Sequence, residues 1–565
     1  QYSKPKITNS NLTITSSVNA TAFMISGYIN NNANGFTTPE LSGNKIVGYK
    51  YPFVISNDAY PTISGNDVSG CVFKGIGLQG TFYTNYTLGD YNKLPYQLSY
   101  SLYIYGNTFT IPSGLSIDMQ ANSINVNAKN SGVLVDRSEA FLNASGVTFT
   151  GSSTGSGLIQ YNGFLGTGQA EFWTGGTMDK CTFNNVRFDI GQYSKPKITN
   201  SNLTITSSVN ATAFMISGYI NNNANGFTTP ELSGNKIVGY KYPFVISNDA
   251  YPTISGNDVS GCVFKGIGLQ GTFYTNYTLG DYNKLPYQLS YSLYIYGNTF
   301  TIPSGLSIDM QANSINVNAK NSGVLVDRSE AFLNASGVTF TGSSTGSGLI
   351  QYNGFLGTGQ AEFWSGGTMD KCTFNNVRFE INQYSKPKIT NSNLTITSSV
   401  NATAFMISGY INNNANGFTT PELSGNKIVG YKYPFVISND AYPTISGNDV
   451  SGCVFKGIGL QGTFYTNYTL GDYNKLPYQL SYSLYIYGNT FTIPSGLSID
   501  MQANSINVNA KNSGVLVDRS EAFLNASGVT FTGSSTGSGL IQYNGFLGTG
   551  QAEFWTGGTM DKCTF

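Results

Sequence analysis

Short apolar stretches in this chain alternate with small polar residues, and the alternation has a period of two, which is typical of β-strands. One phrase recurs: an apolar residue, a small polar residue, Gly, Asn, a spacer and another apolar residue. Its clearest forms are residues 41–46, 63–68 and 104–109, and looser forms are residues 7–12, 142–147 and 178–183. No sustained 3.6-residue apolar period with capping signals is present, so the pattern predicts a chain almost without helix.

The spacing of this phrase predicts a coiled chain path. Two successive phrases begin 22 residues apart, at Leu41 and Ile63, and a spacing of 20 to 22 residues is about what one turn of a three-sided β-coil requires. The longer intervals predict coils that carry loops, or pairs of coils. Residues 81–103 are the best loop candidate because they interrupt the pattern with tyrosines, and Asn34-Gly35 and Asn162-Gly163 are predicted to be loop tips.

The phrase has a physical basis in such a coil. Aliphatic residues at matching positions of successive coils stack into internal columns, and Asn at a bend can join a ladder of side-chain amides. We therefore expect Asn44, Asn66 and Asn107 on bends. The alternative is an ordinary hairpin turn in a β-sandwich. Hairpins prefer the order Asn-Gly, whereas the recurrent order here is Gly-Asn.

Residues 42–48, 52–56 and 61–70 resemble the parallel β-helix repeat of pectate-lyase-like proteins. The resemblance covers about 30 residues of each copy. It implies a right-handed coil with Asn at the bends and aliphatic side chains inside. The fold class expected is therefore all-β, a right-handed parallel β-helix, or β-solenoid.

The whole chain repeats with a period of 191 residues. We expect a β-helix repeat in each of residues 1–191, 192–382 and 383–565, the last lacking its C-terminal end. The copies differ at three positions: Thr174/Ser365/Thr556, Asp189/Glu380 and Gly191/Asn382. The chain is expected to be an excerpt of a longer mature protein. Three copies stacked without a break predict a rod on the order of 90 to 130 Å long.

The charges exclude several classes of protein. Only 10% of residues are charged, with 29 basic and 29 acidic side chains, so the basic patch of a nucleic-acid-binding protein is not indicated. No apolar run reaches the ~18 residues that cross a bilayer. With no histidine to titrate and few carboxylates, we expect stability to change little between about pH 2 and pH 8.

Candidate chemistry is sparse. The absence of histidine removes imidazole-dependent catalysis, and no acidic cluster of a calcium site is present, so no catalytic, cofactor-binding or metal residues are predicted. The densest charge group, residues 136–139, is either a saccharide or calcium-assisted site or a solvated ion pair. The tryptophans Trp173, Trp364 and Trp555 are either sugar-stacking platforms or contacts between copies.

Cysteines and glycosylation sequons occur at fixed places in each copy. Cys71 and Cys181 are too far apart along a coil stack to form a disulfide, and we expect all six cysteines to be free. Each copy has four sequons that permit N-glycosylation, and Asn85 is the most favourable of them. The candidate sites are Asn11, Asn19, Asn85, Asn143, Asn202, Asn210, Asn276, Asn334, Asn393, Asn401, Asn467 and Asn525.

Near-identical modules in series add length to a fibre or stalk but bring little to an enzyme, so the repetition favours a structural function. The first hypothesis is a non-catalytic, extracellular structural protein of a microbe, a solenoid that forms a cell-surface filament, stalk or sheath by self-association or by further copies of the repeat. The second is a repetitive adhesin or carbohydrate-binding protein, with Trp173, Tyr83, Tyr86 and the residues around Asp90 contacting surface glycans. The third, a polysaccharide lyase or hydrolase, is suggested by the family resemblance and opposed by the missing motifs.

Overall fold

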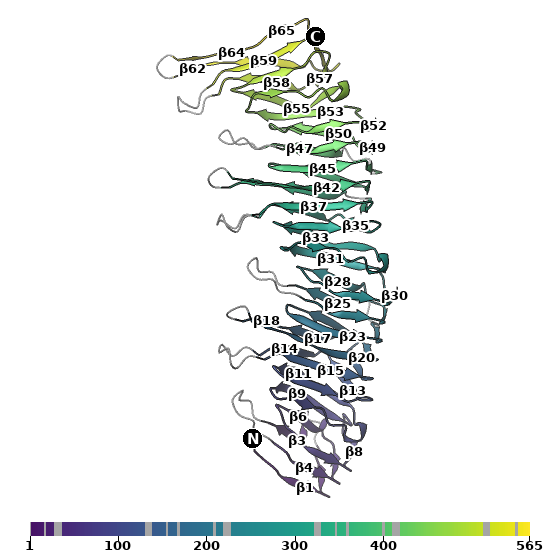
Figure 1. The fold of residues 1–565 in the computed structure, drawn as a ribbon. Helices are drawn as coiled ribbons and strands as arrows, with labels where there is room; N and C mark the ends of the chain where they lie inside the picture. Colours follow the sequence, from purple (N-terminus) through teal and green to yellow (C-terminus); the bar gives the residue numbers. More distant parts are fainter. Residues whose placement is uncertain are drawn as a thin grey trace. The chain divides into compact units, whose positions relative to one another are not determined.

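The alternating pattern forms parallel strands stacked as successive turns of a coil (Figure 1). The computed structural model describes residues 2–15, 19–27, 37–129, 138–153, 156–166, 170–206, 211–218, 228–320, 329–344, 347–357, 361–397, 402–409, 419–511, 520–548 and 552–565. It divides into two units, Gln1–Leu269 and Gln270–Phe565, which are described separately. Each unit contains one boundary between copies, after Gly191 in the first and after Asn382 in the second.

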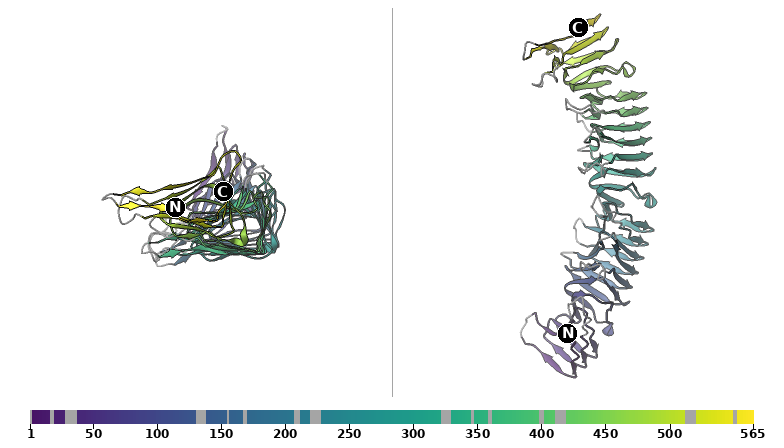
Figure 2. Two further views of the ribbon diagram at one scale, coloured as in Figure 1. Left: turned by 90° about the horizontal axis from the view of Figure 1, so that it is seen from above. Right: turned by 60° about the vertical axis from the view of Figure 1, so that its left-hand side comes forward.

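In the first unit, each coil contributes a strand to up to three faces (Figure 2). The first face holds β1 (Lys6–Thr8), β4 (Glu40–Ser42), β7 (Thr62–Ser64), β10 (Tyr86–Thr87), β12 (Thr108–Ile111), β15 (Ala140–Ser145), β20 (Thr174–Asp179), β23 (Ser194–Thr199), β26 (Glu231–Ser233) and β29 (Thr253–Ser255). The second holds β2 (Asn11–Thr13), β5 (Lys45–Val47), β8 (Asp67–Gly70), β13 (Ser116–Gln120), β16 (Thr148–Gly151), β21 (Thr182–Asn184), β24 (Asn202–Thr204), β27 (Lys236–Val238) and β30 (Asp258–Gly261).

The third face holds the longest strands. They are β3 (Thr21–Ser26), β6 (Tyr51–Ser56), β9 (Ile76–Phe82), β11 (Tyr96–Tyr105), β14 (Ser123–Asn127), β17 (Gly157–Asn162), β22 (Val186–Ile190), β25 (Thr212–Ser217) and β28 (Tyr242–Ser247). Two further strands, β18 (Phe164–Leu165) and β19 (Glu171–Phe172), pair antiparallel as a hairpin between the third face and the first. The described strands of the first copy make seven coils.

The second unit repeats these faces; β31 (Ile267–Phe273) spans the division. Its first face holds β32 (Tyr277–Thr278), β34 (Thr299–Ile302), β37 (Ala331–Ser336), β42 (Ser365–Asp370), β45 (Ser385–Thr390), β48 (Glu422–Ser424), β51 (Thr444–Ser446), β54 (Tyr468–Thr469), β56 (Thr490–Ile493), β59 (Ala522–Ser527), β64 (Thr556–Gly557) and β65 (Met560–Asp561). The second holds β35 (Ser307–Gln311), β38 (Thr339–Gly342), β43 (Thr373–Asn375), β46 (Asn393–Thr395), β49 (Lys427–Val429), β52 (Asp449–Gly452), β57 (Ser498–Gln502) and β60 (Thr530–Gly533).

The third face of the second unit holds β33 (Tyr287–Tyr296), β36 (Ser314–Asn318), β39 (Gly348–Asn353), β44 (Val377–Ile381), β47 (Thr403–Ser408), β50 (Tyr433–Ser438), β53 (Ile458–Phe464), β55 (Tyr478–Tyr487), β58 (Ser505–Asn509) and β61 (Leu540–Asn544). Hairpins β40 (Phe355–Leu356) with β41 (Glu362–Phe363), and β62 (Phe546–Leu547) with β63 (Glu553–Phe554), correspond to β18 and β19. The helical elements of the described residues are the short 3₁₀ turns η1 (Tyr91–Lys93), η4 (Tyr282–Lys284) and η7 (Tyr473–Lys475). The prediction of an all-β parallel solenoid is confirmed.

Inward side chains form the predicted columns. On the third face of the first unit, one column runs through seven registered coils: Phe82, Ile104, Val126, Tyr161, Ile190, Ile216 and Ile246. Each of these side chains is buried. Burial of such stacked apolar area is the main stabilising contribution in a solenoid, because each coil contacts only its neighbours.

The amide ladder is also confirmed. Asn44 is 1% exposed and lies at the bend between the first two faces. Its Oδ1 accepts a hydrogen bond from Ser10 N, and its Nδ2 donates to Asn66 Oδ1, each at 3.0 Å. Asn107 lies on a different bend, between β11 and β12, where its Nδ2 donates to the Phe82 carbonyl of the preceding coil. The same Gly-Asn phrase therefore serves two corners of the coil.

Two loop predictions are wrong. Residues 81–103 follow the path of the coil, in which β10, η1 and most of β11 succeed one another, and three of their aromatic side chains enter the interior. Phe82, Tyr86 and Tyr96 are buried. Asn162-Gly163 is not a loop tip, because it joins β17 directly to β18, and Gly163 N donates to Gln192 O. The other predicted tip, Asn34-Gly35, lies outside the described residues.

Candidate functional site

The joint between copies is the part of this molecule that a tandem-repeat protein depends on most. At the first joint, the strand pairing continues past Gly191 on all three faces. Strand β20 pairs with β23, β21 with β24 and β22 with β25, all parallel. At the second joint, β42, β43 and β44 pair with β45, β46 and β47 in the same registers. Each joint is therefore built as the coils within a copy are built.

An aromatic column crosses each joint. Phe188 lies in the last coil of the first copy and stacks on Phe214 of the second copy, with ring centroids 5.0 Å apart, and Phe214 stacks on Phe244 at 5.7 Å. In the second unit, Phe379 stacks on Phe405 at the same distance of 5.0 Å. These stacked rings continue the apolar core across the joint, which favours a rigid connection.

Side-chain hydrogen bonds connect the two copies on the outer side of the first joint. Asp179 Oδ1 accepts hydrogen bonds from Thr199 Oγ1 and Asn200 Nδ2 of the next copy, both at 2.8 Å. The two side-chain donors, Asn200 and then Thr199, hold the pKa of the Asp179 carboxyl below its usual value. Next to it, Cys181 N donates to Ser201 Oγ, and Ser201 N donates to Asn235 Oδ1, so the ladder of the bend continues across the joint.

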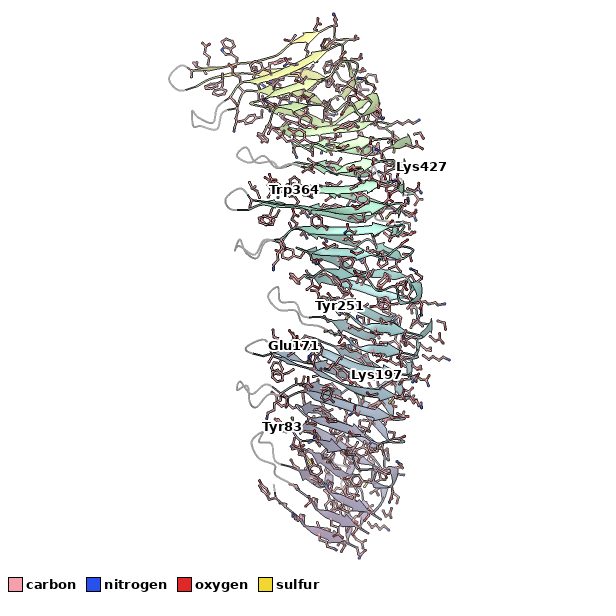
Figure 3. The ribbon with its side chains drawn as sticks, in the orientation of Figure 1. Tyr83, Glu171, Lys197, Tyr251, Trp364 and Lys427 are labelled. Atoms are coloured by element: carbon pink, nitrogen blue, oxygen red, sulfur yellow. The ribbon has the colours of Figure 1, made fainter. Side chains whose placement is uncertain are left out.

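The tryptophan of each complete copy contacts the following copy. Trp173 is half-buried, packs edge-on against Tyr193 with ring centroids 5.6 Å apart, and has Lys195 Nζ 4.9 Å above its ring. Trp364 makes the same contacts with Tyr384 and Lys386 (Figure 3). Of the two interpretations weighed for these residues, the geometry agrees with a contact between copies.

All three positions at which the copies differ lie at the joints. Thr174 and its counterpart Ser365 each keep a 2.8 Å hydroxyl contact with a serine of the next copy, Ser194 or Ser385. At Gly191 a side chain is absent, whereas Asn382 Nδ2 donates to Asn353 Oδ1 at 2.9 Å. Sequence comparison identified these differences but not their common location, which only the coil register brings together.

The ligand contacts of the second hypothesis are only partly exposed. Tyr83 is half-buried against Tyr105, and Asp90 is exposed and pairs with Lys93. Tyr86 is 3% exposed and donates its hydroxyl to the Ala59 carbonyl, so it has no surface for a glycan. In the charge group 136–139, Asp136 and Arg137 lie outside the described residues, and Glu139 accepts from Trp173 N at 3.4 Å.

The sequons remain predictions, but their side chains differ in exposure. Those on strand surfaces and bends are exposed: Asn11, Asn19, Asn85, Asn202, Asn276, Asn393 and Asn467. A second group is half-buried, with each Oδ1 accepting from a threonine N–H of the next coil: Asn143, Asn334 and Asn525. Asn210 and Asn401 lie outside the described residues.

One buried carboxylate was not singled out by the sequence. Asp58 is 5% exposed, at a left-handed bend with φ 56°. It accepts from Tyr83 N at 2.9 Å and from Thr84 N and Oγ1. Burial raises its pKa although these donors oppose the shift. The only sequence signal was an Asn-Asp pair after a strand, which is common at solvent-exposed turns.

Among the described residues, no group of three His, Cys, Asp or Glu side chains is placed to hold a metal ion. In the same part of the chain, no helix is long and apolar enough to cross a membrane. No protein-family model and no curated protein matches the sequence.

Thiol reactivity tests the cysteine positions. The structure has six free cysteines, of which five are buried and Cys563 is half-buried. Burial raises the pKa of Cys71, Cys181 and Cys372, and raises it to about 12 at Cys262 and Cys453. Since the thiolate is the reactive form, a colorimetric thiol reagent should modify Cys563 first and the other five only after unfolding. A native protein that yields all six thiols at once would contradict this burial.

Acid titration tests the carboxylates, whose shifts have opposite signs. Burial raises the pKa of Asp58 and Asp189, so protonating them stabilises the folded form as pH falls. Hydrogen bonds lower the pKa of exposed Asp67 and of Asp179, and the stability that they contribute is lost only as pH falls below about 3.8, the ordinary value. Chemical denaturation should therefore give a nearly constant free energy of unfolding from pH 8 to about pH 4, and the protein should remain folded at pH 2. Cooperative unfolding near pH 4 would contradict it.

Proposed function

We propose that this protein is a non-catalytic, extracellular structural protein whose solenoid builds a cell-surface filament, stalk or sheath. The single observation that carries the proposal is the construction of the joints. Both internal boundaries between copies continue the strand pairing on all three faces and continue the aromatic column, so each added copy extends the coil. Modules connected for separate binding events are instead joined by flexible linkers.

The finer type that we propose is the right-handed β-helix of pectate-lyase-like proteins. Two features support it: the three-faced coil with an asparagine ladder at one bend, and the general right-handed preference of β-crossovers to a parallel strand. Self-association, or further copies of the repeat, supplies the remaining length. Glycans at the exposed sequons would suit a surface location.

Electron microscopy of the native material tests the filament. Seven coils at about 4.8 Å each predict an axial repeat of about 34 Å. We expect filaments, or a layer built from them, with that periodicity along the axis. Isolated particles at all concentrations, or filaments with an unrelated axial repeat, would contradict the proposal.

A glycan-binding adhesin is the second candidate, and exposed tyrosines favour it. Tyr100 is 71% exposed and Tyr103 44% exposed on β11, and their counterparts recur once in each copy with the same exposure: Tyr291 and Tyr294, then Tyr482 and Tyr485. Aromatic faces of this kind stack on sugars. A glycan array should give binding that disappears when Tyr100, Tyr291 and Tyr482 are all replaced by Ala. Absence of binding by the wild-type protein favours the purely structural function.

A further inference from the structure

One pair of tyrosines recurs on neighbouring coils of every copy. Tyr83 directly follows β9, and Tyr105 ends β11. These two strands pair Phe82 with Ile104, so the two tyrosines lie at the next position of adjacent coils. Their ring centroids are 5.6 Å apart and the ring planes meet at 88°. The corresponding pairs keep the same distance, with angles of 85° and 84°: Tyr274 with Tyr296, and Tyr465 with Tyr487.

Both rings of each pair reach the surface. Tyr83 and Tyr105 are half-buried, as are their counterparts in the other two copies. Neighbouring strands lie about 4.8 Å apart, so the two side chains start close enough for a bond between their rings. Side chains that are open to solvent on one side change rotamer rapidly, which lets the two rings turn toward each other.

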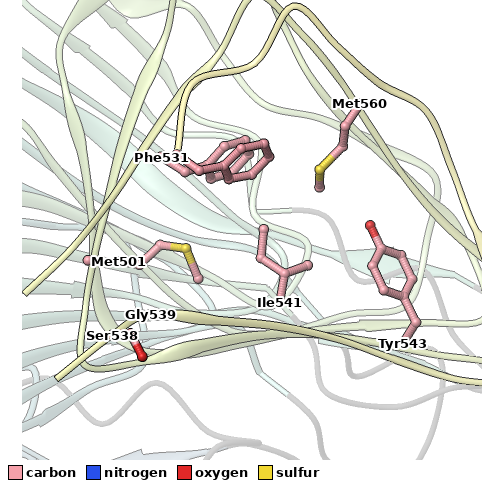
Figure 4. Close-up of a pocket in the computed structure, with 9 residues that line it drawn as sticks. Met501, Phe531, Ser538, Gly539, Ile541, Tyr543 and Met560 are labelled. Carbon is pink, nitrogen blue, oxygen red and sulfur yellow. The ribbon is translucent and has the colours of Figure 1, made fainter.

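Other tyrosines differ in access or in neighbours. Tyr60 and Tyr86 have ring centroids 4.8 Å apart, but Tyr86 is 3% exposed, and a ring enclosed in a packed core keeps its position. Tyr543 lines a pocket of about 420 Å³, and no second tyrosine is among the described residues that line this pocket (Figure 4). The pair of Tyr83 and Tyr105 combines access from solvent with a second phenol in contact.

We propose that Tyr83 and Tyr105, with the corresponding pairs, are a site of oxidative cross-linking that joins adjacent coils as dityrosine. A one-electron oxidant of the peroxidase class removes one electron and one proton from each phenol. The two phenoxyl radicals form a carbon–carbon bond between their Cε atoms, and the hydrogen on each coupled carbon moves to the oxygen, which restores both phenols. Overall, two electrons and two protons leave the pair and reduce one hydrogen peroxide to two waters.

The bond ties one coil to the next outside the hydrophobic core. Tyr83 and Tyr105 are 22 positions apart, and a cross-link that closes such a loop restricts the unfolded chain. Cross-linked protein should therefore unfold at a higher denaturant concentration than the unmodified protein. The inference goes beyond the structural function and does not depend on it, because each bond lies within one copy.

Oxidation of the folded protein by a peroxidase and hydrogen peroxide, at low protein concentration, tests the site. We expect dityrosine fluorescence from the monomer, a mass lower by two hydrogen atoms for each bond, and linked peptides that join the Tyr83 position to the Tyr105 position. Protein oxidised in urea should give at least about tenfold less of this linked peptide, because only the fold holds the two phenols together. Absence of dityrosine in the folded monomer, or an equal yield of links between other tyrosines, would overturn the proposal.

Conservative variants locate the bond. Tyr105→Phe, combined with Tyr296→Phe and Tyr487→Phe, keeps the rings but removes the hydroxyls that form the radicals, so the monomer should lose its dityrosine fluorescence. Replacing the other partner in each pair should give the same loss: Tyr83→Phe, Tyr274→Phe and Tyr465→Phe.

The matched control lies two residues away on the same strands. Tyr103→Phe, combined with Tyr294→Phe and Tyr485→Phe, removes phenols that are more exposed, at 43 to 44%, and should leave the fluorescence at the wild-type level. Fluorescence that survives in the Tyr105 variant, or that is lost equally in the control, would contradict the assignment. Filaments in electron micrographs of native material would still support the structural function, since the two tests are independent.

Discussion

Replacing Ile63 by Asp is expected to unfold the coils around it. Ile63 is 6% exposed at the centre of β7, and its strand register places it in a column with Leu41 and Ile7. The Asp carboxyl at this position is either ionised without a partner or neutral with a raised pKa. We therefore expect the free energy of unfolding to fall by about 4 kcal/mol. Amide hydrogen exchange, with the change in local free energy of opening as the readout, measures this loss.

Ser64→Asp is the matched control, one residue along the same strand. Ser64 is exposed on the outer surface, and a charge there should change stability by no more than about 0.5 kcal/mol. Because each coil contacts mainly its neighbours, exchange in the third copy should be unchanged in both variants. Equal losses in Ile63→Asp and Ser64→Asp would mean that β7 is not oriented as described.

Gly218→Ala is the second substitution with a large expected effect. A Cβ atom on Gly218 would lie 1.6 Å from the Asn248 carbonyl oxygen of the next coil, which sits at a bend with φ 52°. The same close approach recurs at Gly27 with Asn57 O and at Gly409 with Asn439 O. The backbone, and not a flexible side chain, must move to make room for the Cβ atom. We therefore expect the free energy of unfolding to fall by about 3 kcal/mol or more, measured by chemical denaturation and hydrogen exchange.

Gly256→Ala separates this steric effect from backbone strain. Gly256 has φ 61°, which an L-residue adopts at a cost of about 1 kcal/mol, and the nearest atom to an added Cβ is 3.8 Å away. We therefore expect a loss of about 1 kcal/mol there. If Gly218→Ala costs no more than Gly256→Ala, the coils do not approach as closely at Gly218 as the structure has them.

The predicted Asn107 bend and the predicted 81–103 loop show two properties that a local sequence pattern does not determine: the corner of the coil that a bend occupies, and the burial of an aromatic side chain. A Gly-Asn phrase satisfies the backbone of any tight bend, so the pattern located Asn44 and Asn107 on bends but did not assign them to different corners. The tyrosines of residues 81–103 resembled surface loop composition. Tyr86 and Tyr96 are buried because each hydroxyl finds a backbone carbonyl acceptor, that of Ala59 or Gly89, which a linear pattern does not reveal.

Alternation, turn chemistry and spacing are properties of the linear chain, and they were enough to predict the parallel coil, its repetition, its internal columns and the free cysteines. The contacts that make up the joints were visible in the folded structure alone. The contacts of Trp173 with Tyr193, of Asp179 with Asn200 and of Phe188 with Phe214 join residues 20 to 26 positions apart. Their meeting depends on the exact path of one coil and the register of the next, and small shifts in loop length along that coil would pair different residues.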